Sequence, residues 1–210
     1  MESESFAVQR TALAGQESYT GEVTVSAPPA LACALIAPRI NVLRAQHPQL
    51  SLQLIGSLGS ASLSRREADI AVRLSRPKEP DLVARKVETI PFYLYGSADY
   101  VSKTAPEDLA FIAYDETMEQ SPQQVWLKAQ AGDRPILLRS NELNIQATIA
   151  QAGGGVAALP YFLGDRYGLQ AMESVSADLA RDVWLVVHSD IRHTPSVQAV
   201  MNFRVSCFES

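Results

Sequence analysis

Short strand-like and helix-like segments alternate from the start of the chain, and this alternation restricts the fold more than any other feature. Val23 and Val25 alternate with polar neighbours, which predicts a strand over residues 22–26. Residues 31–46 carry apolar side chains at a rough 3.6-residue period, which predicts a helix beginning near Pro29. A strand followed directly by a helix is the first half of a βαβ unit.

Two further strands are predicted after this helix. Leu50, Leu52 and Leu54 alternate with polar residues, and residues 68–75 form a continuous apolar run of the buried, parallel type. Pro38 lies inside the predicted helix and should kink it, because proline cannot donate a backbone hydrogen bond. The repeated strand–helix–strand order predicts an α/β fold with right-handed crossovers.

A second α/β set is predicted from Ser97 onward. Before it, two extended stretches flank residues 89–91, and segments 82–95 and 183–190 are predicted to cross between two similar lobes. The elements expected are short helix 98–103, strand 111–115, helix 121–130, strand 136–140, helix 141–153, strand 155–160, strand 182–189 and terminal helix 194–209.

Three consecutive glycines, Gly153 to Gly155, mimic a nucleotide-binding loop, because Gly153 to Ala158 match G-x-G-x-x-A. A dinucleotide fingerprint needs a strand before the glycines and a helix after them. Here a predicted helix precedes them and a predicted strand follows. The glycines are therefore expected to end a helix, where glycine supplies the left-handed C-terminal residue.

The composition argues against direct DNA contact and against a membrane span. The formal net charge of the 210 residues is −5, and only four of the 18 basic residues are lysine. A domain that grips phosphates on its own is usually basic. No segment approaches 18 apolar residues, and the N-terminus lacks the apolar core of a signal peptide, so a cytoplasmic protein is expected.

Catalytic, metal and cofactor sites are not predicted. The three histidines fit no metal-ligand spacing, and there is no Gly-x-Ser-x-Gly sequence for a serine hydrolase. Asp69 is expected to cap local backbone rather than to catalyse. Cys33 and Cys207 are expected to be small buried residues in helices, with a redox pair as the alternative.

Small polar residues recur where predicted strands turn into helices. Ser26, Ser57, Ser60, Ser140 and Asn141 occupy such junctions. Ligands of open α/β sheets bind outside the carboxyl ends of the strands, and free N–H groups at helix starts favour anions. A shared ligand cleft is one interpretation of this set, and ordinary helix capping is the other.

In order and spacing, several stretches resemble the effector-binding (substrate-binding) domain of LysR-type transcriptional regulators. They are YTGEVTVSAP, LIAPRINVLRAQHPQLSLQL, READIAVRLSRP, DLVARKV, LRSNELNIQATIAQAGGGVAALP and VWLVVHSDIRHTPSVQAVMNF. The resemblance covers roughly residues 19–205. It implies two Rossmann-like lobes in a periplasmic-binding-protein-like (type II) fold, joined by two crossover strands.

This resemblance also implies how the chain is divided. Regulatory lobe I would comprise residues 21–90 plus 189–210, and regulatory lobe II residues 91–188. Residues 1–20 would be the end of the linker helix that follows a winged helix-turn-helix in this family, which leaves DNA contact to that N-terminal domain. A homodimer is implied, with helix 31–46 of one subunit against helix 141–152 of the other.

Carried over by position, the effector contacts implied are Pro29, Ala30, Leu31, Ser57, Leu58, Ser140 and Asn141. Two departures from the family pattern stand out. The first helix usually opens with a Ser or Thr, but here the turn is Pro-Ala-Leu, so anion binding there would rest on backbone N–H groups. Gly154 replaces an apolar residue, at an expected entropic cost of about 1 kcal/mol.

The function implied is sensing of a small, anionic effector that modulates DNA binding by the regulator. A transporter's solute-binding protein shares the fold and is the alternative, which would require a secretory signal. An enzyme on the same fold is a weaker alternative, because the sequence offers no nucleophile or acid–base pair. No metal, cofactor or membrane partner is expected.

Overall fold

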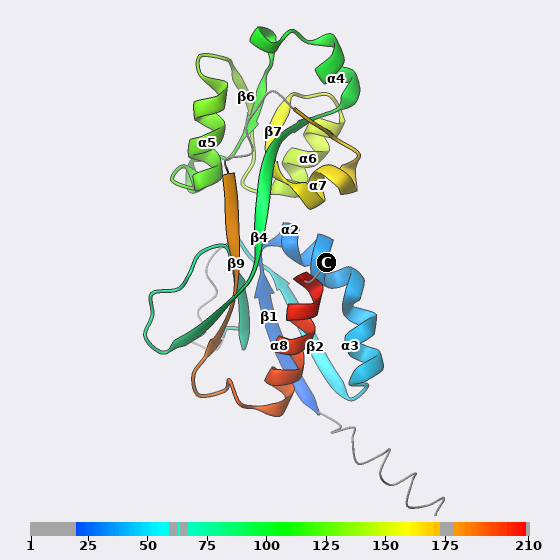
Figure 1. Cartoon of the computed structure of the whole chain (residues 1–210), viewed down its shortest axis with the longest axis vertical. Coiled ribbons are helices and arrows are strands. Elements are labelled where there is room, and N and C mark those ends of the chain that lie inside the picture. Colours follow the sequence, from blue (N-terminus) through cyan, green and yellow to red (C-terminus); the bar gives the residue numbers. More distant parts are fainter. Residues whose placement is uncertain (1–19, 59–62, 64–66, 173–178, 209–210) are drawn as a thin grey trace, which may run out of the picture.

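The computed structural model describes residues 20–58, 63, 67–172 and 179–208 and shows two α/β lobes joined by two long strands (Figure 1). The predicted linker remnant before residue 20 and the junction residue Ser60 lie outside these described residues. One hydrogen-bonded sheet passes through both lobes, in the order β2-β1-β3-β9-β4-β7-β5-β6, with β8 beside β4.

Lobe I is built on β1 (Gly21–Ala27), β2 (Leu50–Gly56) and β3 (Ile70–Arg73). Strands β2 and β3 both pair parallel with β1, as the strand–helix–strand order predicts. The prediction that β3 is an all-parallel strand is wrong on one side, since β3 pairs antiparallel with β9. Helix α8 (Pro195–Phe208) packs against β1 and β4.

The predicted interruption of the first helix at Pro38 is confirmed. The segment consists of α2 (Pro29–Leu31), a π-helical turn (Ala32–Ile36), a 3-10 turn (Ala37–Arg39) and α3 (Ile40–Gln46). Because Pro38 has no N–H, nearby carbonyl groups lose their helical donor. The Cys33 carbonyl instead accepts a hydrogen bond from Arg166 of lobe II at 2.8 Å. In the turn before Pro38, the Cys33 carbonyl of lobe I thus accepts a hydrogen bond from lobe II.

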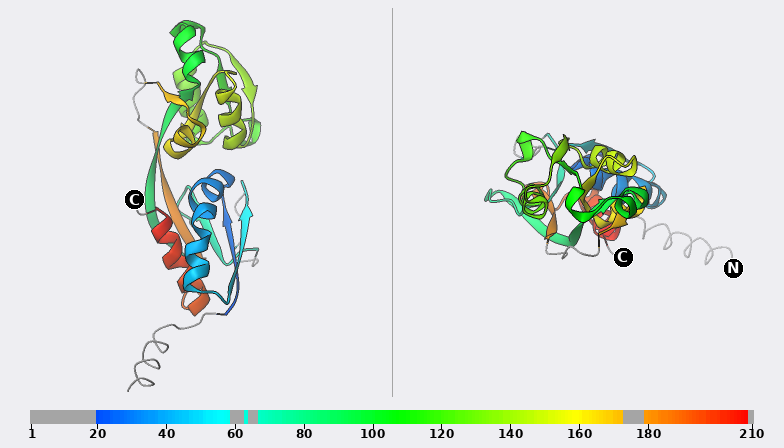
Figure 2. Two further views of the ribbon diagram at one scale, coloured as in Figure 1. Left: turned by 90° about the vertical axis from the view of Figure 1, so that its right-hand side faces the viewer. Right: turned by 90° about the horizontal axis from the view of Figure 1, so that it is seen from above.

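Two strands connect the lobes, β4 (Leu82–Gly96) and β9 (Leu179–His188), and they run side by side as antiparallel partners (Figures 1 and 2). The prediction of two extended stretches around residues 89–91 is wrong, because β4 is continuous. Its ladder with β9 is irregular only between Lys86 and Glu88. The predicted crossing by these two segments is confirmed.

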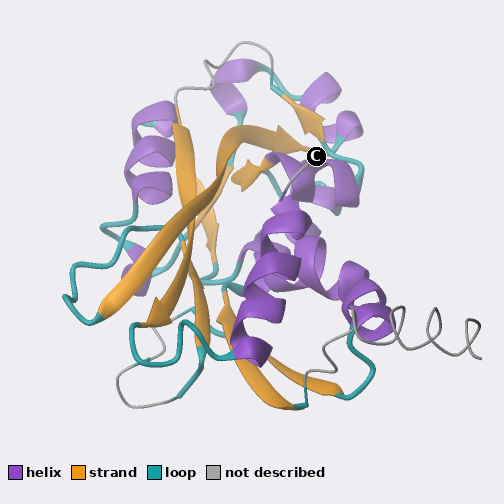
Figure 3. Ribbon diagram, turned by 60° about the horizontal axis from the view of Figure 1, so that its bottom comes forward, coloured by secondary structure: helices purple, strands orange, loops and turns teal. Residues whose placement is uncertain are grey.

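Lobe II contains all the elements predicted for it, together with a helix, a short strand and two 3-10 turns that were not predicted. It comprises α4 (Ala98–Lys103), β5 (Phe111–Ala113), α5 (Pro122–Ala131), β6 (Ile136–Arg139), α6 (Leu143–Gln151), β7 (Val156–Pro160), α7 (Tyr161–Tyr167) and β8 (Gln170–Ala171), with 3-10 turns at Pro106–Asp108 and Glu116–Met118. Helix α7 and strand β8 were not predicted. The helices lie on both sides of the strands (Figure 3).

The three consecutive glycines end helix α6, as predicted. Gly153 has φ +82° and follows the last helical turn, and the Gly154 N–H donates to the Ile149 carbonyl at 2.9 Å. A Cβ atom on Gly154 would lie 2.6 Å from Ile149 Cγ2. A Cβ atom at this position would therefore force the Ile149 side chain to shift, which favours glycine.

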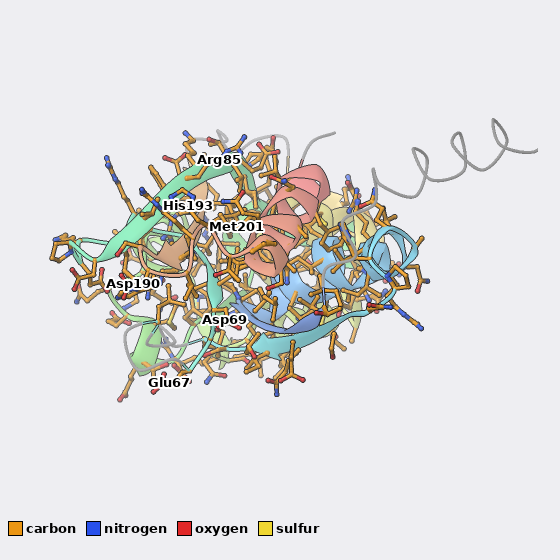
Figure 4. All side chains as sticks on the ribbon, turned by 90° about the horizontal axis from the view of Figure 1, so that it is seen from below. Glu67, Asp69, Arg85, Asp190, His193 and Met201 are labelled. Carbon is orange, nitrogen blue, oxygen red and sulfur yellow. The ribbon has the colours of Figure 1, made fainter. Side chains whose placement is uncertain are left out.

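The predictions for Asp69 and Cys207 are confirmed, and the prediction for Cys33 is wrong. Asp69 is a structural carboxylate, as predicted, because its Oδ2 accepts a hydrogen bond from the Thr24 N–H at 2.8 Å at the lobe I end of the molecule (Figure 4). Cys207 is buried, as predicted, but Cys33 is exposed, so the prediction of burial is wrong for Cys33.

Candidate ligand-binding cleft

A cavity of about 260 Å³ lies at the carboxyl ends of β1, β2 and β3, facing lobe II. Its wall comprises Ser26, Pro28, Pro29, Ala30, Ser57, Leu58, Ala71, Val72, Arg73, Leu74, Ser75, Tyr114, Met118, Ser121, Pro122, Gln123, Glu142, Leu143 and Arg181. These residues come from both lobes and from a connecting strand. The carboxyl ends of parallel strands are where open α/β sheets hold ligands.

The lobe I wall contains four of the seven predicted contacts: Pro29, Ala30, Ser57 and Leu58. Pro29 and Ala30 open the first helix directly after β1, and the Ser57 N–H donates to the Ala27 carbonyl at 2.9 Å. This bond fixes the turn after β2 beside the end of β1. Leu58 is 44% exposed, so it supplies an apolar surface at the rim of the cavity.

The other three predicted contacts do not line the cavity. Leu31 is 2% exposed and belongs to the core. Ser140 is engaged in the turn before α6, where its Oγ accepts from the Glu142 N–H at 3.2 Å and its carbonyl accepts from Gln146 at 2.7 Å. Asn141 is exposed beside it. In place of Ser140 and Asn141, the wall at the start of α6 is formed by Glu142 and Leu143.

Glu142 replaces the predicted capping residues because α6 begins at Leu143, two residues later than predicted. Its Oε2 accepts a hydrogen bond from the Ile145 N–H at 3.1 Å, and its Oε1 accepts from Asn144 at 2.7 Å. A carboxylate at this end of a helix is favoured by the helix dipole. The lobe II side of the cavity wall thus includes the carboxylate of Glu142, which caps α6.

Arg181 of β9 is a wall residue absent from the predicted set. Its Nη2 donates to the Leu74 carbonyl at 2.8 Å, and its Nη1 donates to Gln123 Oε1. Burial lowers the pKa of the Arg181 guanidinium from its ordinary value. In the sequence Arg181 stands beside Asp182, just before the apolar run at residues 183–187, so the pair resembles ordinary charged residues at a strand end and gives no signal of the cavity.

Tyr114 is a buried residue of the wall that interacts electrostatically with both Arg181 and Glu142. Burial raises the pKa of Tyr114 well above its ordinary value, while the charges of Arg181 and Glu142 act on it in opposite directions. The backbone of Tyr114 is held on both sides by Gln124, whose Oε1 accepts from the Tyr114 N–H at 3.0 Å. A neutral phenol in this position can donate or accept one hydrogen bond.

The described wall of the cavity contains hydroxyl, amide, carboxylate and guanidinium groups, all of which can bind a polar ligand. Within the described part of the chain, no group of three or more His, Cys, Asp or Glu residues could hold a metal ion. No helix in that part is both long and apolar enough for a bilayer crossing.

The family model for the LysR substrate binding domain matches residues 16–205. The chain belongs to this family. This LysR substrate binding domain is 30% identical over 180 residues to the Mau operon transcriptional activator of Paracoccus denitrificans, a match that covers 85% of the chain and 62% of that protein. It is 25% identical over 158 residues to an uncharacterized HTH-type transcriptional regulator of Haemophilus influenzae, covering 70% and 54% respectively.

Solved LysR-type structures have the same fold. CrgA, a LysR-type transcriptional regulator from Neisseria meningitidis, matches with a TM-score of 0.79 and 21% identity, covering 99% of this domain and 75% of that chain. The effector domain of AmpR from Pseudomonas aeruginosa matches with a TM-score of 0.69 and 18% identity, covering 90% and 95%. The resemblance and the two-lobe fold predicted from it are therefore confirmed.

Proposed function

We propose that this LysR substrate binding domain senses a small anionic effector in the cleft between its lobes. One observation carries the proposal: the cavity takes its wall from both lobes and contains a partly buried guanidinium, that of Arg181, whose hydrogen bonds to other described residues all go to neutral acceptors. A ligand that touches both walls binds some lobe arrangements better than others, and this differential affinity is what shifts a conformational equilibrium.

In the whole regulator, we propose that this shift modulates DNA binding by a winged helix-turn-helix domain in the cytoplasm. The two curated relatives are named as a transcriptional activator and a transcriptional regulator, and this domain spans only 62% and 54% of their lengths. Their names favour regulation over solute capture for a transporter, and over catalysis. The lobe division at residues 21–90 plus 189–210 and 91–188 is part of the same proposal.

The sensing proposal predicts that filling the cavity mouth abolishes ligand binding. In a thermal-shift panel of small carboxylates, amino acids and aromatic acids, at least one compound should raise the melting temperature of the wild type. A site filled at a hundredfold excess over Kd adds about 2.7 kcal/mol to the free energy of unfolding. Leu58→Trp adds bulk at the rim and should remove this shift.

Val83→Trp is the matched control, because Val83 is also exposed but does not line the cavity. It should keep the ligand-induced shift of the wild type. If no compound shifts the wild type, or if Leu58→Trp and Val83→Trp respond alike to the compound that does, the cleft is not the sensing site.

We also propose a homodimer in which helix 31–46 of one subunit packs against helix 141–152 of its partner. Val42 on α3 is 50% exposed and Ile145 on α6 is 51% exposed, so each helix presents an apolar side chain to solvent. The neighbouring edge strand β6 adds Leu137, which is 67% exposed. Apolar side chains left exposed on two separate helices would be covered by the antiparallel pairing.

Sedimentation velocity tests the dimer. The wild type should sediment as a dimer, and Ile145→Glu should shift it to monomer, because it would bury a charge in the interface. Val125→Glu, at a position 57% exposed on α5, is a control that should stay dimeric. A wild type that is monomeric at all concentrations, or an Ile145→Glu variant that remains dimeric, would contradict this interface.

A further inference from the structure

Arg181 is bonded to both lobes at once. It lies on β9 opposite Ile90 of β4, where the two connecting strands cross from one lobe to the other. One of its donors reaches the Leu74 carbonyl, just beyond β3 of lobe I, and the other reaches Gln123 on α5 of lobe II. The guanidinium is therefore placed to respond to any change in the spacing of the two walls.

The positive charge of Arg181 has no carboxylate hydrogen-bonded to it among the described residues. Its strand neighbour Asp182 bonds instead to Lys86 at 2.7 Å and to Thr89 at 2.9 Å. Arg73, the other cation of the cavity wall, has Glu79 at 3.4 Å. Of the two arginines in the described wall, Arg181 is therefore the one whose hydrogen bonds go to neutral oxygens, although bonds from a guanidinium to a carboxylate are roughly twice as strong.

Gln123 occupies the position that an anionic oxygen would favour. Its side-chain oxygen accepts the Arg181 bond, and the residue is only 2% exposed, so the contact is shielded from bulk water. Shielding strengthens a charged pair and raises the cost of leaving the guanidinium without one. The amide oxygen of Gln123 is a weaker acceptor for the Arg181 guanidinium than a carboxylate oxygen would be at the same position.

We propose that Arg181 anchors a carboxylate of the effector, which displaces the amide oxygen of Gln123 from the guanidinium. Two N–H groups of Arg181 donate to the two carboxylate oxygens, the geometry in which arginine recognises planar anions. The inference rests on the proposed sensing function and names the chemical class of its ligand. Because the displaced bond ties lobe II to the connecting strand, the same step couples binding to lobe arrangement.

The other charge on the wall restricts the class further. Glu142 lines the cavity and, like Arg181, lies close enough to Tyr114 to influence its pKa. A second negative charge on the ligand would be repelled by this carboxylate. The ligand class is therefore a monocarboxylate, with a dicarboxylate of the same size bound more weakly.

Calorimetric titration with matched probes tests the proposal. The probes are benzoate and its neutral counterpart benzamide, hexanoate and hexanamide, and the dianion phthalate. The wild type should bind at least one monocarboxylate, and bind the corresponding amide and phthalate at least about tenfold more weakly. Arg181→Gln should weaken carboxylate binding by about thirtyfold or more, since truncating one partner of a shielded charge pair is costly.

Three further variants keep the test decisive. Arg181→Lys keeps the charge but loses the paired donors, so it should bind with intermediate affinity and provides a readout if Arg181→Gln fails to fold. Gln123→Glu places a competing carboxylate on Arg181 and should weaken benzoate or hexanoate binding at least about tenfold. Arg85→Gln removes an exposed charge of β4 at the surface (Figure 4) and should change affinity less than about twofold.

The outcomes separate the two proposals. If the wild type binds carboxylates and both Arg181 variants bind them equally well, Arg181 is not the anchor, while the sensing function stands. If the wild type binds the amides as tightly as the acids, a small ligand is sensed but the carboxylate assignment is wrong. If the wild type binds none of these probes, the monocarboxylate assignment is overturned, and the broad thermal-shift panel alone then decides on sensing.

Discussion

Replacing Gly155 by alanine should lower the free energy of unfolding by about 3 kcal/mol, from backbone strain and a steric clash together. Gly155 has φ +134°, where residues with a Cβ are rarely found. A Cβ atom there would lie 2.7 Å from the Ala110 carbonyl oxygen. That oxygen cannot move away cheaply, because it accepts the Val156 N–H at 2.9 Å. Urea unfolding followed by circular dichroism measures the loss.

Gly168, which follows α7, supplies a control. It has φ +60° and ψ +37°, in the left-handed helical region, and a Cβ atom there would meet nothing within 4 Å. Gly168→Ala should therefore cost only the conformational penalty, about 1 kcal/mol. Equal losses in the two variants would show that the contact between Gly155 and Ala110 is not what requires glycine at the end of the α6 turn.

Replacing Arg204 by methionine is expected to stabilise the domain by about 1–4 kcal/mol. Arg204 on α8 is 0% exposed, and all three of its guanidinium nitrogens lack a hydrogen-bond partner in the described structure. Burial lowers the pKa of Arg204 to about 10, which reflects the cost of keeping the charge out of water. Methionine fills similar space without a charge, so the melting temperature should rise.

Arg85→Met is the control for this substitution, because Arg85 is exposed and its replacement should change stability by less than about 0.5 kcal/mol. A melting temperature that falls by several degrees in Arg204→Met, with Arg85→Met unchanged, would contradict the account. It would mean that the Arg204 guanidinium is paired in solution and that its removal breaks a favourable bond.

Lobe I was predictable because its signals are local. The alternation of Val23 and Val25, the helical period after Pro29 and the apolar run at Ile70 each depend on residues a few positions apart. The sequence predicted two extended stretches around residues 89–91, whereas β4 continues through Pro91. In the structure β7 begins to pair with β4 only at Phe92, next to Pro91, and proline is tolerated where a ladder needs no N–H donor.

Helix α7 escaped prediction because it starts immediately after β7 without a polar capping side chain. Pro160 ends the strand and also precedes the first helical residue, Tyr161. Gly168, at φ +60°, is the signal that could have marked the end of this helix. The residues between them lack a clear periodic pattern, since Phe162, Leu163 and Gly164 are all buried.

The wall of the candidate cleft also contains residues that the sequence could predict and residues that it could not. Ser57 and Leu58 were predictable because strand ends fix their place, but Ser140 and Asn141 were displaced from the wall by a helix that begins two residues later. Arg181 could not be assigned from sequence, because its partners Gln123 and Leu74 lie 58 and 107 residues away along the chain. Such contacts depend on the lobes being assembled.

The most direct test of the central claim is a crystal structure of this domain with the monocarboxylate that binds it most tightly. The account predicts the ligand in the cavity between Ser57 and Gln123, with its carboxylate oxygens about 2.7–2.9 Å from the Arg181 guanidinium nitrogens. Electron density for the ligand outside this cavity, or inside it with the Arg181–Gln123 bond intact and the carboxylate elsewhere, would contradict the account.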